Sequence, residues 1–125
     1  PEEAKKAISY GKDESSPPKC YLSSGMSCLD FKVDNKGPLG QGQITLVLMN
    51  GMGYDIESVV VKVENCGDTT ASPITMAYKE QKVFKVICNS TLSSAIFDEE
   101  FQVLWLDPAT SISLMGRGKI KAKIE

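Results

Sequence analysis

The sequence predicts an all-β protein, an antiparallel β-sandwich of about seven strands with immunoglobulin-like architecture and two disulfides. Apolar and polar residues alternate with a period of two along most of the chain, which is the pattern of half-buried strands. Clusters of Gly, Pro, Asn and Asp separate the alternating segments, and the gaps are too short for the crossover helices that parallel strands require. Four cysteines in 125 residues indicate a disulfide framework that supports a small core.

Seven alternating segments supply the expected strands. In each of them an apolar residue recurs at every second position, so that one face of the strand turns to a shared core. Leu29 and Tyr78 are expected to face this core with the rest. The segments are 29–34, 44–49, 59–64, 74–79, 84–88, 101–106 and 119–125.

Some apolar residues fall on the outward positions of these strands. Three explanations are open: these side chains are exposed like many apolar residues of protein surfaces, they are covered by loops, or they form a contact surface for a neighbouring copy of the chain. These residues are Val47, Met49, Val60, Ile87, Leu104 and Leu106.

A single domain is expected over residues 20–125. Residues 1–19 are charged and rich in helix breakers, which predicts a flexible linker or the end of a residual N-terminal helix. The chain begins at Pro1 and not at Met. We therefore expect that its natural N-terminus was processed or cut away, and that any membrane anchoring comes through a segment before Pro1.

The run NGMGYD, which begins at Asn50, lies between two expected strands. It is typical of a hairpin connection in which Asn50 and Gly51 have positive φ. Tyr54 lies in the same loop and is a candidate ligand contact.

The four cysteines allow three pairings. We favour Cys20–Cys28 and Cys66–Cys88, because both close local loops that are rich in Ser, Gly and Thr. Cys66 also follows one expected strand and Cys88 ends another, which suits a bond between strand ends. The alternatives are a zinc site with four cysteine ligands and free cysteines in a cytosolic protein. Zinc sites of that kind use closely spaced cysteine pairs, and this chain has none.

Asn89-Ser90-Thr91 is an N-x-T glycosylation sequon directly after Cys88. It opens a polar stretch between two expected strands, so its side chain is expected to be exposed. Sequon and disulfides together predict an extracellular or cell-surface location.

Composition excludes several classes of function. The chain has no histidine, so Ser-His-Asp and Cys-His catalysis are ruled out within it, and we expect no enzymatic activity and no cofactor. A net charge of −2 argues against nucleic acid as a partner, because nucleic acid requires a clustered basic face. No apolar run approaches the roughly 20 residues of a membrane helix.

An acidic run, Asp98-Glu99-Glu100, precedes the strand that carries Trp105. Together with Asp107 it could supply carboxylate oxygens for calcium, but the spacing is not that of an EF-hand. A charged hairpin tip explains the run equally well, so we expect no metal site.

Part of the sequence resembles the extracellular domains of archaeal type IV pilin-like proteins. The resemblance spans residues 20–125 and rests on the order of the cysteines, the segment ITLVLMNGMGYDI and the final strand GKIKAKIE. It implies a β-sandwich head, often glycosylated and disulfide-bonded, that follows an N-terminal hydrophobic helix. A true immunoglobulin domain is not expected, because its Trp lies between the paired cysteines, whereas Trp105 follows Cys88.

Two functions agree with these observations. The first is a non-catalytic extracellular structural or adhesive subunit, pilin-like, which associates with itself or with other surface proteins in a cell-surface filament. The alternative is a soluble secreted binding module, for a carbohydrate or protein ligand, within a larger surface protein.

Overall fold

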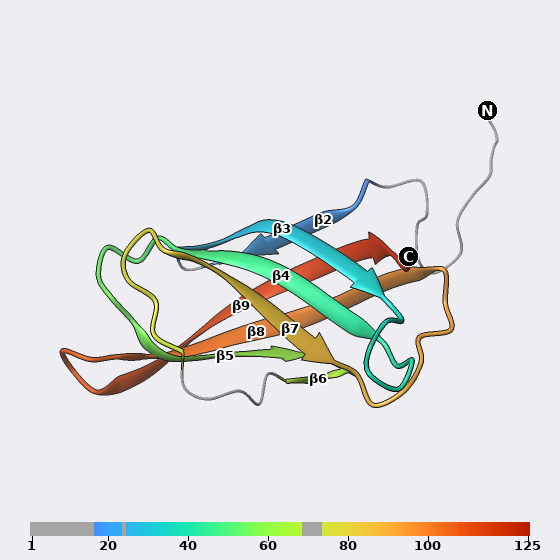
Figure 1. The fold of residues 1–125 in the computed structure, drawn as a ribbon. Coiled ribbons are helices and arrows are strands. Elements are labelled where there is room, and N and C mark those ends of the chain that lie inside the picture. Colours follow the sequence, from blue (N-terminus) through green and yellow to red (C-terminus); the bar gives the residue numbers. More distant parts are fainter. Residues whose placement is uncertain (1–16, 24, 69–73) are drawn as a thin grey trace.

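A computed structural model describes residues 17–23, 25–68 and 74–125. Two antiparallel sheets pack face to face in this part of the chain (Figure 1). The five-stranded sheet has the order β2-β9-β8-β5-β6, and the three-stranded sheet has the order β3-β4-β7. The predicted antiparallel β-sandwich is therefore confirmed. Its strands are β2 (Lys19–Leu22), β3 (Met26–Asp34), β4 (Gln43–Asn50), β5 (Glu57–Val63), β6 (Gly67–Asp68), β7 (Gln81–Ile87), β8 (Ile96–Asp107) and β9 (Ile112–Lys123).

The β8–β9 hairpin is the frame of the five-stranded sheet. Its ladder is in register from Ile96↔Lys123 to Asp107↔Ile112, and its tip projects at one end of the molecule (Figure 1). The side chain of Asp107 accepts the backbone N–H of Ala109 at 2.9 Å and so fixes the turn. Strand β2 adds to β9 and β5 adds to β8, so the other strands of this sheet are arranged around the hairpin.

The core lies between the two sheets and consists of every second residue of the long strands. Alternation is strict in β4, where each inward side chain is buried and each outward one is half-exposed. This follows from the opposite directions of successive side chains on a strand. The largest fully buried side chains include Phe84, Phe101, Ile44, Leu46, Leu48, Ile56, Met76 and Ile120.

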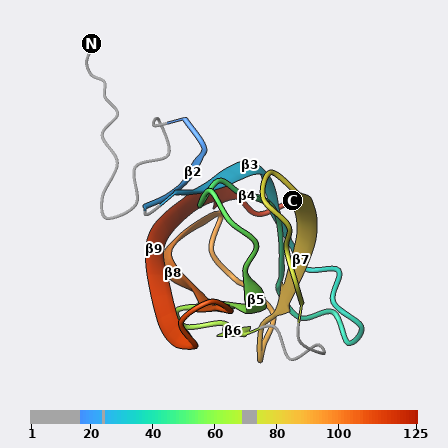
Figure 2. The same cartoon turned by 90° about the vertical axis from the view of Figure 1, so that its left-hand side faces the viewer.

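Both disulfides have the predicted pairing, and each joins an edge of one sheet to an edge of the other. Cys20 of β2 bonds to Cys28 of β3, with 5.9 Å between their Cα atoms. Cys66, directly before β6, bonds to Cys88, directly after β7. Since β2 and β6 are the outer strands of one sheet and β3 and β7 those of the other, the sandwich is cross-linked on both open sides. Figure 2 shows β2 beside β3 in the end-on view.

A further link between the sheets lies at the C-terminus. The backbone N–H of Glu125 donates to the carbonyl of Val33 at 2.9 Å, and Ile124 forms a parallel bridge with Val33. The last residues of the chain therefore cover part of the edge of β3, which reduces the unpaired backbone that an edge strand exposes.

Asn50 organises one end of the sandwich from a fully buried position. Its Nδ2 donates to the carbonyls of Tyr54, at 2.9 Å, and Met76, at 3.1 Å. Its Oδ1 accepts the N–H of Met52 at 2.9 Å. A buried amide is tolerated only when its donors and acceptors are satisfied, and here they hold three chain segments together.

The predicted hairpin at Asn50 and Gly51 is wrong. Strand β4 lies in the three-stranded sheet and β5 in the five-stranded sheet, so the loop between them crosses from one layer to the other. The positive φ in this loop, 94°, belongs to Gly53. Asn50 is required for its side-chain hydrogen bonds and not for a left-handed backbone conformation.

Two predictions about strands and core residues also fail. Residues 74–79 do not form a strand, since only Met76 bridges Ile56, and Tyr78 is exposed. In β3 the register shifts between Cys28 and Asp30, a bulge that turns Leu29 outward and leaves it 46% exposed. A bulge adds one residue to one strand and thereby changes which residues face the core.

The outward apolar residues lie where the alternation predicts. All six are half-buried, and each of them except Leu106 lies between two buried neighbours in the chain. Val47 and Met49 lie on the outer face of the three-stranded sheet, with Val83 directly opposite Val47. Val60 and Leu104 are opposite each other on the outer face of the five-stranded sheet, and Met115 is opposite Leu104.

We expect removal of the disulfides to destabilise the domain unequally. The bonds close loops with sequence separations of 8 and 22 residues, which in the chain-entropy model contribute roughly 2.5 and 3.4 kcal/mol. In urea unfolding, the free energy of unfolding should therefore be highest for the wild type, lower for Cys20→Ala/Cys28→Ala and lowest for Cys66→Ala/Cys88→Ala. Equal midpoints and slopes for all three proteins would show that the cross-links do not constrain the unfolded chain.

Replacement of Asn50 should be costly for its size. Asn50→Ala leaves the carbonyls of Tyr54 and Met76 and the N–H of Met52 without this partner, so we expect a loss of about 2–4 kcal/mol in unfolding free energy. Asn89→Ala is the matched control, since Asn89 is exposed and should change stability by less than about 0.5 kcal/mol. Similar small effects for both variants would contradict the organising role of Asn50.

Candidate functional site

The sequon lies on a well-anchored segment beside the Cys66–Cys88 disulfide. The hydroxyl of Thr91 donates to the carbonyl of Gly40 at 3.0 Å, and the carbonyl of Ser90 accepts the N–H of Gly42 at 2.9 Å. Asn89 itself is exposed. The predicted exposure of its side chain is confirmed, and the neighbouring residues hold the backbone around it in place.

Tyr54 is placed less favourably for a ligand. Its ring is half-buried and packs against the core, and its carbonyl accepts from Asn50. Tyr21 and Tyr78 are more accessible, with 54% and 47% of their surface exposed.

The acidic run does not form the expected hairpin tip. Asp98, Glu99 and Glu100 lie within β8, where successive side chains point to opposite faces. Asp107 lies nine residues beyond Asp98 on the same strand, which corresponds to a distance of roughly 30 Å at about 3.3 Å per residue. Across residues 17–23, 25–68 and 74–125, no three His, Cys, Asp or Glu side chains come together so as to hold a metal ion.

The most distinct polar site lies on the outer face of the five-stranded sheet. Directly opposed residues of neighbouring antiparallel strands share a face, so the register builds two adjacent rows across the sheet. One row runs Tyr21, Lys119, Glu100. The next runs Arg117, Gln102, Lys62, and Glu64 extends the first row by donating its backbone N–H to the carbonyl of Glu100.

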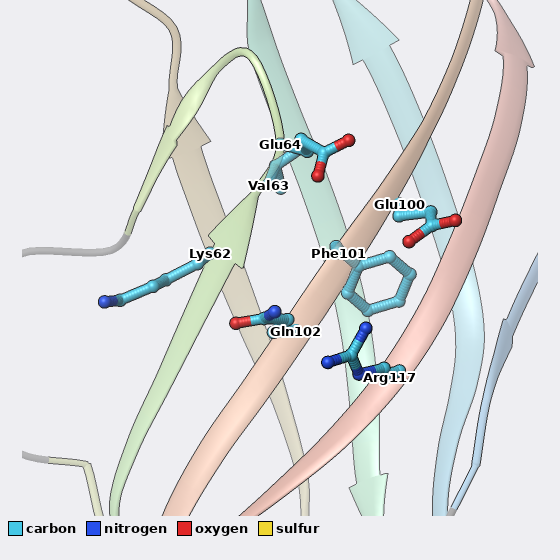
Figure 3. Close-up of a pocket in the computed structure, with 7 residues that line it drawn as sticks. All are labelled: Lys62, Val63, Glu64, Glu100, Phe101, Gln102 and Arg117. Carbon is cyan, nitrogen blue, oxygen red and sulfur yellow. The ribbon is translucent and has the colours of Figure 1, made fainter.

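Two depressions of about 230 and 270 Å³ lie among these side chains and have Glu100 and Arg117 in common. We call them together the Arg117 groove. It is lined by the outward side chains of Tyr21, Glu64, Glu100, Gln102, Arg117 and Lys119, with Lys62 at its margin. Figure 3 shows Arg117 and Gln102 next to each other on β9 and β8, while the ammonium group of Lys62 points away from the rest.

Charges in the Arg117 groove balance. Lys119 has the Asp98 carboxylate 3.5 Å away, so this cation is neutralised locally. The Oδ1 of Asp98 is buried and makes no hydrogen bond within the described residues, and the Lys119 ammonium is its ion-pair partner. Arg117 and Lys62 are balanced by Glu64 and Glu100, and none of these four side chains has an ion pair or side-chain hydrogen bond in the described part of the chain.

Glycine makes this arrangement possible on β9. Gly116 and Gly118 alternate with Arg117 and Lys119 and face the core. A Cβ on Gly118 would lie 2.7 Å from the Phe101 ring and would also meet the carbonyl of Tyr21. The absence of a side chain therefore lets β2 approach β9 and lets an aromatic ring of β8 cover the strand.

Sequence reasoning missed the Arg117 groove. The available signal was the run Gly116-Arg117-Gly118-Lys119, in which glycine replaces the apolar residue of an alternating strand. Because it lacks inward apolar residues, this segment does not show the alternation of a strand. The last strand, predicted to start at Lys119, begins at Ile112.

Comparison of the chain with models of protein families, with curated proteins and with solved structures finds no match. The resemblance to pilin-like proteins therefore remains a hypothesis based on the sequence. Among the described residues, no helix is long and apolar enough to cross a membrane. The two disulfides place the folded domain in an oxidising environment.

Proposed function

We propose that this chain is a non-catalytic extracellular structural or adhesive subunit, displayed on or assembled into a cell-surface filament, as in the pilin-like proteins that it resembles. The observation that carries the proposal is the pair of disulfides that joins both edges of one sheet to both edges of the other. A protein outside the cell meets proteases and has no chaperones to refold it, so covalent closure of a small sandwich suits that setting.

The outer faces support association with neighbouring molecules. On the three-stranded sheet, Leu29 and Val83 are 46% and 58% exposed. The half-buried Val47 is opposite Val83, and the half-buried Met49 follows on the same face of β4. Neighbouring aliphatic side chains of this kind gain free energy when a partner removes them from water. In the proposed assembly they contact adjacent subunits or other surface proteins.

Glycosylation of Asn89 belongs to the same proposal. The side chain is exposed, and a glycan there would stand clear of both outer faces of the sandwich because Asn89 follows the end of β7. A large hydrophilic group at this point would shield the exposed backbone around Asn89 from proteases.

Immunogold labelling of intact cells with an antibody raised against residues 20–125 tests the location. We expect gold particles on surface filaments, and in the coding sequence we expect an apolar segment of about 20 residues before Pro1. Label confined to the cell interior would contradict the proposal. A start codon close to Pro1 with no apolar segment would contradict the pilin-like part of it.

The mass of the natural protein tests the glycan. We expect a mass above that of the polypeptide, with the excess lost in Asn89→Gln and in Thr91→Ala, because both remove the acceptor motif. Ser90→Ala is the control, since it preserves Asn-x-Thr and should keep the excess mass. A natural protein with the bare polypeptide mass would contradict glycosylation at this position.

A further inference from the structure

We propose that the Arg117 groove binds an uncharged oligosaccharide, and that this site provides the adhesive part of the proposed function, on which the inference rests. The groove is distinct from the loop that contains Tyr54. It lies on the outer face of β2, β9, β8 and β5, and Figure 3 shows the part that β9, β8 and β5 contribute.

The hydrogen-bonding groups of the groove match hydroxyl groups. Arg117 offers five N–H donors in a plane, Glu100 offers two acceptor oxygens, and the Gln102 amide offers both kinds. A sugar hydroxyl donates and accepts at once, and neighbouring hydroxyls on a ring present two such groups side by side. Planar side chains such as guanidinium, carboxylate and amide engage paired groups of this kind in a bidentate manner.

The charge balance of the groove selects against ionic ligands. Two free cations, Arg117 and Lys62, are offset by two free anions, Glu64 and Glu100, and the fifth charge is paired within the protein. A nucleic acid or other polyanion requires an excess of positive charge, and a cationic peptide requires the reverse. A neutral ligand with many hydroxyls can form hydrogen bonds with both the cationic and the anionic side chains and is repelled by neither.

The extent of the groove indicates an oligomer. From β2 through β9 and β8 to β5 there are three strand spacings, about 14 Å at 4.7–4.9 Å each. This span exceeds one sugar ring. At the β2 end Tyr21 is 54% exposed, and its ring provides an apolar surface for the C–H face of a sugar.

The strands fix the backbone positions of these groups before a ligand arrives. Each of Tyr21, Glu100, Gln102 and Arg117 projects from a hydrogen-bonded strand, and sites built on strands keep their geometry better than sites on loops. The depressions are open and shallow, so we expect dissociation constants in about the millimolar range.

NMR titration of the ¹⁵N-labelled, disulfide-bonded chain with four neutral trisaccharides tests the proposal. The probes are maltotriose, cellotriose, mannotriose and triacetylchitotriose, each to about ten millimolar. At least one should cause saturable shifts of the backbone amides in β2, β8 and β9 around Tyr21, Glu100 and Arg117. Arg117→Ala and Glu100→Gln should each weaken binding about tenfold or more, and both side chains are exposed, so the fold should be retained.

Lys85→Ala is the matched control, since Lys85 is exposed on the outer face of the other sheet, and it should bind as the wild type does. Failure of all four sugars to bind, shifts confined to another face, or equal affinity of Arg117→Ala and Lys85→Ala would overturn the proposal. So would tighter binding of heparin trisaccharide or of a Lys-Glu decapeptide. None of these results changes the immunogold outcome, so a wrong ligand and a wrong cellular location are separable.

Discussion

A sandwich of two small sheets is stable only while the sheets stay in contact, because each of them buries its apolar face against the other. In this protein the contact is secured on both open sides by a covalent bond between edge strands. The terminal residues add a third connection through Val33. The core between these connections can therefore be small, and the side chains on the outer faces are not needed to hold the two sheets together.

The periodicity of the sequence predicts most of the fold because most strands are half-buried, and β4 is the clearest case. Prediction fails where the signal depends on distant partners. Leu29 follows the alternation, but the pairing of β3 with β4 inserts a bulge that turns it outward. Residues 74–79 alternate equally well, yet they form no continuous ladder, and Met76 makes only an isolated bridge with Ile56. The cysteine pairing was predictable from local spacing. Its position across both sheet edges was not, because the order of strands in a sheet is set by non-local contacts.

The Arg117 groove was not predictable for a related physical reason. Its side chains come from four strands that are scattered along the chain from Tyr21 to Lys119, and none of them belongs to a recognisable motif. Only the register of β2, β9, β8 and β5 brings them onto one face. By contrast, exposure at Asn89 could be predicted, because a polar stretch between two strands is a local property.

The Cys20–Cys28 bond has a consequence for a chain under tension. Strand β2 is four residues long and, among the residues that the structure describes, pairs with β9 alone, so a pull on the backbone ahead of Lys19 would by itself separate it from the sheet one hydrogen bond at a time. Because the disulfide transmits the force to β3 in the opposite sheet, the pull acts on both sheets together. The interlocked core then resists in shear, and the domain can carry force through its shortest terminal strand.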